Sequence, residues 1–235
     1  MRCLVFDAGP IISLTMNDLL WLLEQLKSRF RGQFYISKAV KEELVDRPFN
    51  TKKFKFEALK VLQYLSKDVL RVVDNERIKQ KAEYLLELAN HCFRARDQYI
   101  TIVHQGEMEA LAVALLLKAE AFVVDERTTR YLIDKPEQLG KRMEQKLHTH
   151  VETDRQNLQR FKEEVDGLRV IRSIELVTIA YEMGLLDLYI TEKEEKLMPD
   201  IRKDLLESAL WTVKLNGCAV SEDEINDIMK FENPK

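Results

Sequence analysis

The chain has few of the residues that interrupt regular structure and none of the patterns that anchor or cross-link a chain. Only 7 glycines and 5 prolines occur among its 235 residues, so we expect long helices and few irregular segments. The 3 cysteines (Cys3, Cys92 and Cys218) are scattered and odd in number, which excludes a disulfide framework and favours a reducing compartment. No apolar run approaches the roughly 18 residues of a membrane-spanning helix, and the first residues lack the apolar stretch of a signal peptide. These absences predict a cytoplasmic protein with no membrane segment.

The chain as a whole also lacks a large excess of positive or negative charge. The 37 Lys and Arg residues face 40 Asp and Glu residues, so the net charge of −3 does not by itself indicate a nucleic-acid-binding protein. Hydrophobic residues (46%) and charged residues (33%) occur in the proportions of a globular protein. Residues 47–100 depart from this balance, with 12 Lys and Arg against 7 Asp and Glu, an excess of +5. That excess could contact phosphate groups, or it could be a solvated helical face.

Short apolar runs alternate with amphipathic stretches along the chain. Strands are predicted at residues 3–6, 33–36, 70–73, 121–124 and 168–171, and helices at 38–45, 76–93, 106–120 and 173–183. A turn is expected at 7–10, and the helix after it can be capped by Asn17 or Asp18. Alternation of this kind favours a parallel sheet with helices on both faces, in which reactive groups lie beyond the carboxyl ends of the strands. Asp7 and Asp125 both occupy that position.

Acidic residues next to apolar segments are the candidates for chemistry: Asp7, Glu43, Glu109, Asp125 and Glu126. Each has an ordinary structural explanation when taken alone, as a turn aspartate, a helix-capping acid or a solvated acid. The neighbouring Glu42 and Glu107 are explained in this way, as a solvated acid and as an acid at the helix dipole. Glu109 is different, because Ala112 and Val113 follow it on the same helical face and its carboxylate therefore needs a partner.

Taken together, the acids indicate a metal centre. Carboxylate oxygens are the ligands that Mg²⁺ and Mn²⁺ prefer. Such ions activate water and stabilise a leaving oxygen, and hydrolysis of a phosphodiester needs both. The 4 histidines (His91, His104, His148 and His150) lack a convincing ligand spacing, and no Cys/His set suits zinc.

The motifs that contain these acids resemble those of PIN-domain proteins. Residues 4–14 (LVFDAGPIISL) resemble the opening strand and turn of that family, with Asp7 at the strand end, and residues 36–44 (ISKAVKEEL) resemble its second element and select Glu43. Residues 106–112 (GEMEALA), followed by 123–130 (VVDERTTR), are similar to a prokaryotic, largely archaeal subgroup with a Gly-Glu-x-Glu-Ala helix and a paired-acid turn. Glu109 takes the third acidic position of that pattern. Asp125 and Glu126 both remain candidates for the fourth, because this chain has Asp-Glu where two aspartates are usual.

This resemblance implies a PIN-like three-layer α/β/α fold with a central, mainly parallel sheet. It also implies an Mg²⁺- or Mn²⁺-dependent nuclease that hydrolyses RNA, single-stranded RNA being one candidate, and endonucleolytic cleavage as the expected mode. Ser13, Thr128 and Arg130 are expected to orient a ligand or water. A homodimer is expected from the family alone.

The same resemblance sets the expected domain organisation. A nuclease domain is predicted at 1–190, with a basic helical insertion at about 47–100 and a charged helical segment at about 136–165. A C-terminal helical extension is predicted at 191–235.

Other functions remain open from the sequence. A PIN-like protein with weak or no activity could serve as an RNA-binding or assembly module, and some family members are toxins neutralised by an antitoxin protein. A phosphatase-like enzyme with Asp7 as nucleophile is disfavoured, because Gly9 stands where such enzymes commonly have a second aspartate.

Overall fold

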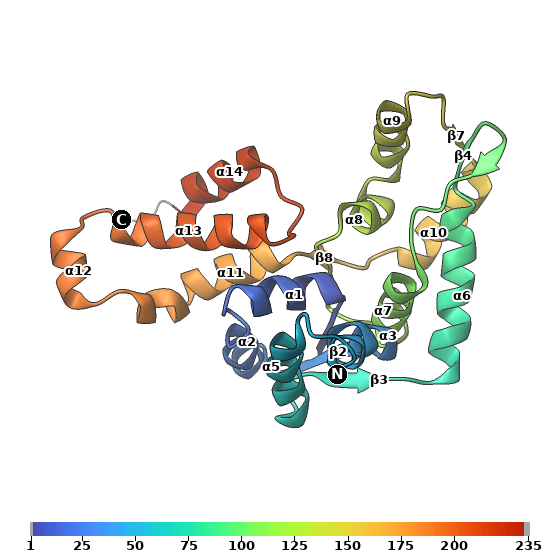
Figure 1. The fold of residues 1–235 in the computed structure, drawn as a ribbon. Coiled ribbons are helices and arrows are strands. Elements are labelled where there is room, and N and C mark those ends of the chain that lie inside the picture. Colours follow the sequence, from blue (N-terminus) through green and yellow to red (C-terminus); the bar gives the residue numbers. More distant parts are fainter. Residues whose placement is uncertain (1, 233–235) are drawn as a thin grey trace.

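A five-stranded parallel sheet forms the centre of the molecule (Figure 1). The computed structural model describes residues 2–232. The strand order is β3-β2-β1-β6-β8, and every neighbouring pair is parallel. The strands are β1 (Cys3–Phe6), β2 (Gln33–Ser37), β3 (Arg71–Val73), β6 (Ala121–Val123) and β8 (Val170–Ile171). This confirms the helix-rich α/β fold with a central parallel sheet that the sequence predicted.

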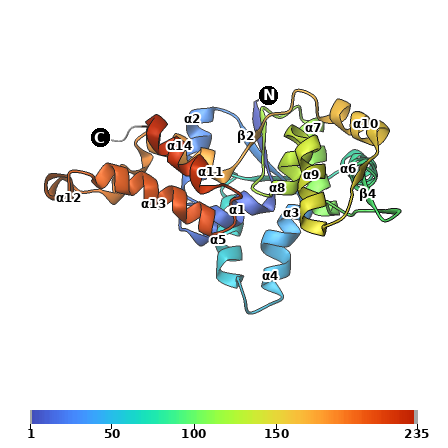
Figure 2. The same ribbon diagram turned by 90° about the horizontal axis from the view of Figure 1, so that it is seen from above.

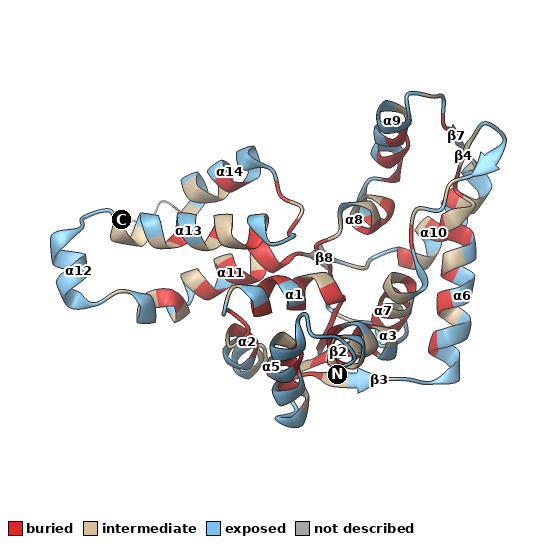
Figure 3. Cartoon of the chain, in the orientation of Figure 1, coloured by how far each residue is buried: buried red, intermediate tan, exposed pale blue. Residues whose placement is uncertain are grey.

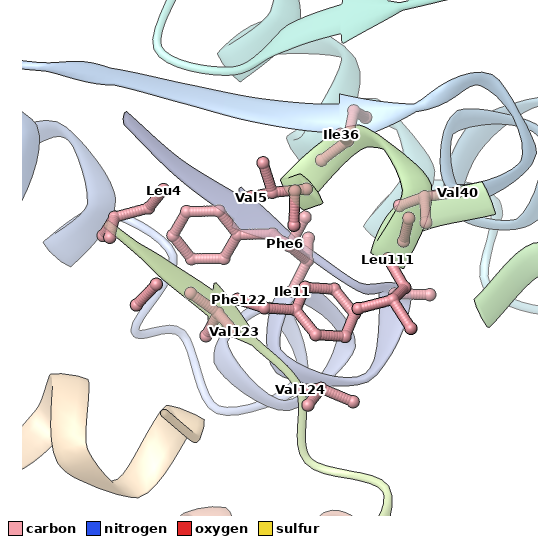
Figure 4. Packing of buried hydrophobic residues seen from close by; sticks show 14 of the residues in the cluster. Leu4, Val5, Phe6, Ile11, Ile36, Val40, Leu111, Phe122, Val123 and Val124 are labelled. Atoms are coloured by element: carbon pink, nitrogen blue, oxygen red, sulfur yellow. The ribbon is translucent and has the colours of Figure 1, made fainter. Parts of the chain in front are cut away.

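The middle strand, β1, is buried along its whole length. A strand covered by helices on both sides requires such a continuous apolar run. Phe6 packs against Phe34 of β2 with ring centroids 5.1 Å apart, and Figure 4 shows Phe6 close to Phe122 and Ile11 in the same apolar cluster. Tight packing of this cluster therefore fixes the point at which β1 ends and Asp7 begins.

Helices cover both faces of the sheet (Figures 1 and 2). On one face α7 (Gln105–Leu116) packs against β1 and β2, with α3 (Lys38–Lys41) and α6 (Glu76–Asn90) beside it. The other layer consists of α1 (Ala8–Met16), α2 (Leu22–Phe30), α5 (Lys55–Ser66) and α11 (Ser173–Glu182). Since α7 lies between the sheet and α6, it is buried on nearly all sides, including the whole run 110–114.

The helix after β2 begins as predicted and then changes its winding. The Ser37 side chain accepts a hydrogen bond from the Val40 backbone N–H at 3.1 Å, so it caps α3. After Lys41 the helix continues as a π-helical turn, η1 (Glu42–Asp46), and then as the short α4 (Arg47–Phe49). Turns of this type are rare and are found most often at functional sites. Glu43 lies on this turn.

Residues 47–100, expected as a basic helical insertion, contribute to the sheet and to both helical layers. They supply the edge strand β3, α5 packed against α1, and α6 packed against α7. A small antiparallel sheet follows, in which β4 (Phe93–Ala95) pairs with β5 (Gln98–Tyr99) and with β7 (Glu152–Thr153).

Residues 136–165, expected as one charged helical segment, form two helices on either side of β7. These are α9 (Pro136–Leu147), which follows α8 (Arg127–Asp134), and α10 (Arg155–Val165), which packs on α6. Figure 1 shows α9 and the β4–β7 region at the end of the molecule opposite α12.

The C-terminal helices pack on the layer that holds α1 and α11. They are η2 (Leu185–Tyr189), α12 (Glu192–Leu197), α13 (Ile201–Leu215) and α14 (Glu222–Glu232). Figure 3 shows α12 exposed, whereas α13 packs along α11. Asn216 donates to Asn17 Oδ1 at 2.6 Å, and Arg172 pairs with Glu224 of α14 at 2.8 Å. Within residues 2–232 no helix is long and apolar enough to cross a bilayer.

One sequence-based prediction is wrong, at the start of α1. A turn was expected at 7–10, with a helix capped by Asn17 or Asp18, but the helix begins at Ala8 and Asn17 is its C-cap. Pro10 fits because it lies in the first turn, where its missing N–H has no intrahelical partner in any case. Asp7 consequently stands at the junction of a strand and a helix N-terminus rather than in a turn.

Candidate active site

Asp7 is a buried carboxylate at the carboxyl end of the central strand. Its backbone N–H donates to Val123 O at 2.9 Å, which extends the β1–β6 pairing by one residue and fixes its position. Only 7% of its surface is exposed. The pKa of Asp7 is raised to about 7, chiefly by burial and also by the charges of Glu107 and Glu43, while hydrogen bonds from the N–H groups of Ala8 and Gly9 oppose the rise. The structure thus holds an acid where its charged form is disfavoured unless a cation accompanies it.

The charges of two glutamates, Glu43 and Glu107, act on Asp7, and the charge of a third, Glu126, acts on Glu107. Glu43 comes from η1 and is exposed, Glu107 comes from the first turn of α7, and Glu126 precedes α8. Burial raises the pKa of Glu107, and the charges of Glu126 and Glu43 raise it too, whereas the hydrogen bond from the His104 N–H lowers it. Glu107 is therefore the member of this group that the other glutamates affect most directly. Among residues 2–232, none of these four carboxylates forms an ion pair with Lys, Arg or His. We call Asp7, Glu43, Glu107 and Glu126 the acidic group.

Glu109, the predicted third acid, lies outside the acidic group. Its Oε1 accepts a hydrogen bond from the Ala39 backbone N–H at 2.9 Å, so it joins α7 to the first turn of α3. Successive residues of a helix are about 100° apart, so Glu109 is rotated by about 200° from Glu107. Of the two glutamates, Glu107 is the one whose charge acts on Asp7.

Asp125 and Glu126, the two candidates for the fourth acid, have different surroundings. Asp125 is 2% exposed, and its two oxygens accept from the Ser173 N–H and the Ser173 hydroxyl, each at 2.7 Å. Burial raises the pKa of Asp125, and the Ser173 bonds and the Cys218 thiol oppose that rise. Glu126 accepts from the Thr129 N–H at 2.6 Å and lies near Glu107. Asp125 is therefore hydrogen-bonded to the first residue of α11, whereas Glu126 belongs to the acidic group.

The three residues expected to orient a ligand are also placed differently from one another. The Ser13 hydroxyl is buried and donates to Val213 O at 3.4 Å, and Arg130 donates to Ala219 O at 3.1 Å. Both side chains thus contact the C-terminal segment. Thr128 is half-buried and lines an open groove beside α8.

The acidic group suits a divalent cation in its chemistry. All four side chains are carboxylates, and the most buried of them has a raised pKa that a bound cation would lower. Gly9 lies between two of the predicted acids, because a Cβ there would be in ordinary van der Waals contact with the Asp125 Cβ at 3.5 Å and with Asp7 Oδ2 at 4.0 Å. No three Asp, Glu, His or Cys side chains in residues 2–232 are already arranged to hold one ion.

The raised pKa of Asp7 predicts that Asp7→Asn stabilises the metal-free protein above neutral pH. The folded protein binds this proton more tightly than the unfolded chain does, so the contribution of Asp7 to stability is greatest below its ordinary pKa of 3.8 and is lost as pH rises to about 7. Asparagine carries no charge to bury. We expect a gain in unfolding free energy on the order of 2–4 kcal/mol at pH 8, measured by urea denaturation in EDTA.

The gain should shrink toward zero as the pH falls below 3.8, where Asp7 is neutral in both the folded and the unfolded protein. Asp223→Asn, an exposed acid on α14, serves as a matched control and should show no such pH-dependent difference. A variant less stable than the wild type at pH 8 would show that its surroundings stabilise the Asp7 carboxylate, contrary to this prediction.

The parallel sheet with helices on both faces defines a three-layer α/β/α protein. A family model described as a PIN domain matches residues 3–136, which is more than half of the 235-residue chain. The chain therefore belongs to the PIN-domain family, as its motifs indicated. Proteins of this family are generally nucleases and typically use divalent metal ions. No curated protein and no solved structure matches the chain.

Proposed function

We propose that the protein is an Mg²⁺- or Mn²⁺-dependent ribonuclease whose cation is held by the acidic group. The observation that carries this proposal is Asp7, a buried carboxylate at the end of the central strand with the charges of Glu43 and Glu107 beside it. Such an arrangement destabilises a metal-free protein, so it needs a function to explain it.

Each acid has a distinct part in the proposed site. Asp7 is fixed by the sheet and offers the most rigid ligand, whereas Glu43 is exposed on its π-helical turn and can rotate to close the site. Glu107 accepts from the His104 N–H at 2.7 Å with one oxygen, which orients the other for binding. A bound divalent ion lowers the pKa of water and stabilises the leaving oxygen of a phosphodiester.

Glu109 and Asp125, which the sequence placed among the ligands, have positioning roles in this proposal. Glu109 holds α7 against α3, so it sets where Glu107 projects. Asp125 is hydrogen-bonded through both oxygens to Ser173 and keeps the loop before α8 in place for Glu126.

The decisive experiment is cleavage of single-stranded RNA by the purified protein with Mn²⁺ or Mg²⁺. We expect cleavage with either ion, none in EDTA, and recovery of activity when the ion is restored. An unchanged RNA pool under all three conditions, from a folded protein, would contradict the proposal and favour an RNA-binding or assembly role.

A further inference from the structure

An open groove of about 760 Å³ lies beside α8 and α9. One wall is the chain between β5 and α7, including Thr101, and the other is formed by α8 and α9. Figure 1 shows this part of the chain running past α8 on its way to α7. Its polar and aromatic lining comprises Thr101, Arg127, Thr128, Tyr131, Arg142 and Lys146, with Gln145 at its edge.

The charge of this groove is of one sign. Arg127, Arg142 and Lys146 line it, and no Asp or Glu does, although the whole chain has a net charge of −3. Within residues 2–232 none of the three cations forms a salt bridge, and all three are exposed. Arg142 lies over the ring of Tyr131 at 5.2 Å from its centroid.

Many cations of the basic segment 47–100, unlike those of the groove, form salt bridges. Six of its twelve cations pair with acids, namely Lys60, Lys67, Arg71, Lys79, Lys81 and Arg94. Half of its charge is therefore already neutralised within the fold. All three cations of the α8–α9 groove are free of such pairs within residues 2–232, and Arg127 directly follows Glu126 of the acidic group.

Both walls of the groove lead into the acidic group. Arg127 and Thr128 directly follow Glu126, and Ile102 on the opposite wall precedes Glu107 by five residues. A polyanion in the groove would therefore lie next to the segments that carry Glu126 and Glu107. An acidic centre repels a phosphate backbone, and cations on its flank would offset that repulsion.

We propose that the α8–α9 groove binds the sugar–phosphate backbone of single-stranded RNA on one side of the cleavage point. Arg142 and Lys146 contact phosphates, Arg127 holds the phosphate nearest the acidic group, and the ring of Tyr131 orients the Arg142 guanidinium. This proposal rests on the proposed ribonuclease function and names how that site holds its substrate.

The test measures binding without cleavage. Fluorescence anisotropy of a labelled single-stranded RNA of about 12 nucleotides is followed in EDTA for the full chain and for the double variant Arg142→Gln/Lys146→Gln. We expect the variant to bind on the order of tenfold more weakly, with the slope of log K against log salt reduced by about 1.4, since each single-strand phosphate contact contributes about 0.7.

The matched control is Lys193→Gln/Lys196→Gln, which removes the same charge from the exposed α12 at the opposite end of the molecule. It should bind RNA as the wild type does. Equal weakening in both variants, or none in the groove variant, would overturn the proposal. A labelled acidic peptide is measured in the same way. If the groove variant loses binding to this peptide but not to RNA, the proposal is overturned in favour of a protein partner.

Failure of the groove and failure of the nuclease function give different results. If the wild type cleaves RNA and the groove variant binds normally, only the groove assignment fails. If the wild type binds RNA through Arg142 and Lys146 but never cleaves it with Mn²⁺, the ribonuclease proposal fails and the groove remains.

Discussion

Asp7→Asn should abolish metal-dependent RNA cleavage, with the rate falling by on the order of a thousandfold or more. The substitution keeps the size of the side chain and its place at the end of β1, but it removes the negative charge that would hold a cation at the most buried point of the acidic group. Initial rates on a labelled RNA at saturating Mn²⁺ measure the effect. Because the same change is expected to stabilise the metal-free protein, lost activity cannot be attributed to unfolding.

Two controls make this prediction sharper. Asp18→Asn changes an exposed acid near the end of α1 at a position of positive φ that asparagine tolerates, and it should cleave RNA as the wild type does. Added Mn²⁺ should raise the unfolding temperature of the wild type and of Asp18→Asn, but not that of Asp7→Asn. Cleavage retained by Asp7→Asn would remove Asp7 from the site.

Glu107→Gln and Glu109→Gln should differ in their effect on cleavage by at least about tenfold. The two glutamates are on the same helix, and in either position glutamine can still accept the existing backbone hydrogen bond, from His104 at 107 and from Ala39 at 109. Of the two, Glu107 is the one whose charge acts on Asp7. We expect Glu107→Gln to lose activity by on the order of 100-fold and Glu109→Gln to remain close to the wild type, as measured by single-turnover cleavage.

The opposite order would restore the assignment made from the motif. If Glu109→Gln loses activity and Glu107→Gln does not, Glu109 is the ligand. Its carboxylate would then have to break its hydrogen bond with the Ala39 N–H to reach the cation. Equal losses in both variants, together with equal losses of stability, would show that the start of α7 as a whole positions the site and that neither glutamate is a ligand.

Much of the fold could be predicted because its local signals agree. The apolar runs gave the strands β1, β2 and β6, Ser37 marked the start of α3, and Gly184, with φ of 68°, ends α11 as expected. Alternation of strands and helices then predicted the parallel sheet. The carboxyl edge of that sheet predicted Asp7 as a site residue, and the structure places Asp7 there with its charged form disfavoured.

The apolar pattern alone does not distinguish Glu107 from Glu109. Ala112 and Val113 follow Glu109 on one face of the helix, and Ala110 and Leu111 follow Glu107 in the same way and are equally buried. In an amphipathic helix the two faces would differ, whereas α7 is covered on nearly all sides. Glu109 was predicted from its place in the motif, whereas the proposal of Glu107 rests on its charge acting on Asp7, which no local pattern indicates.

Long-range contacts explain the remaining differences. Asp125 is hydrogen-bonded to Ser173, 48 residues later, and no local pattern around Asp125 indicates this partner. Likewise Ser13 and Arg130 contact Val213 and Ala219, so their environment depends on helices whose docking the sequence did not predict.

The contacts of residues 213–221 also set the order in which the surroundings of the site can form during synthesis. Ala219 donates its N–H to Asp125 O at 3.2 Å, and Asn216 bonds to Asn17 from 199 residues away. A nascent chain on the ribosome can form β1, β2 and β6 long before residues 213–221 have left the exit tunnel. Until then the loop that carries Asp125 and Glu126 has no support from that side. The contacts of residues 213–221 therefore complete the surroundings of Asp125 and Glu126 only after every strand of the central sheet has been synthesised.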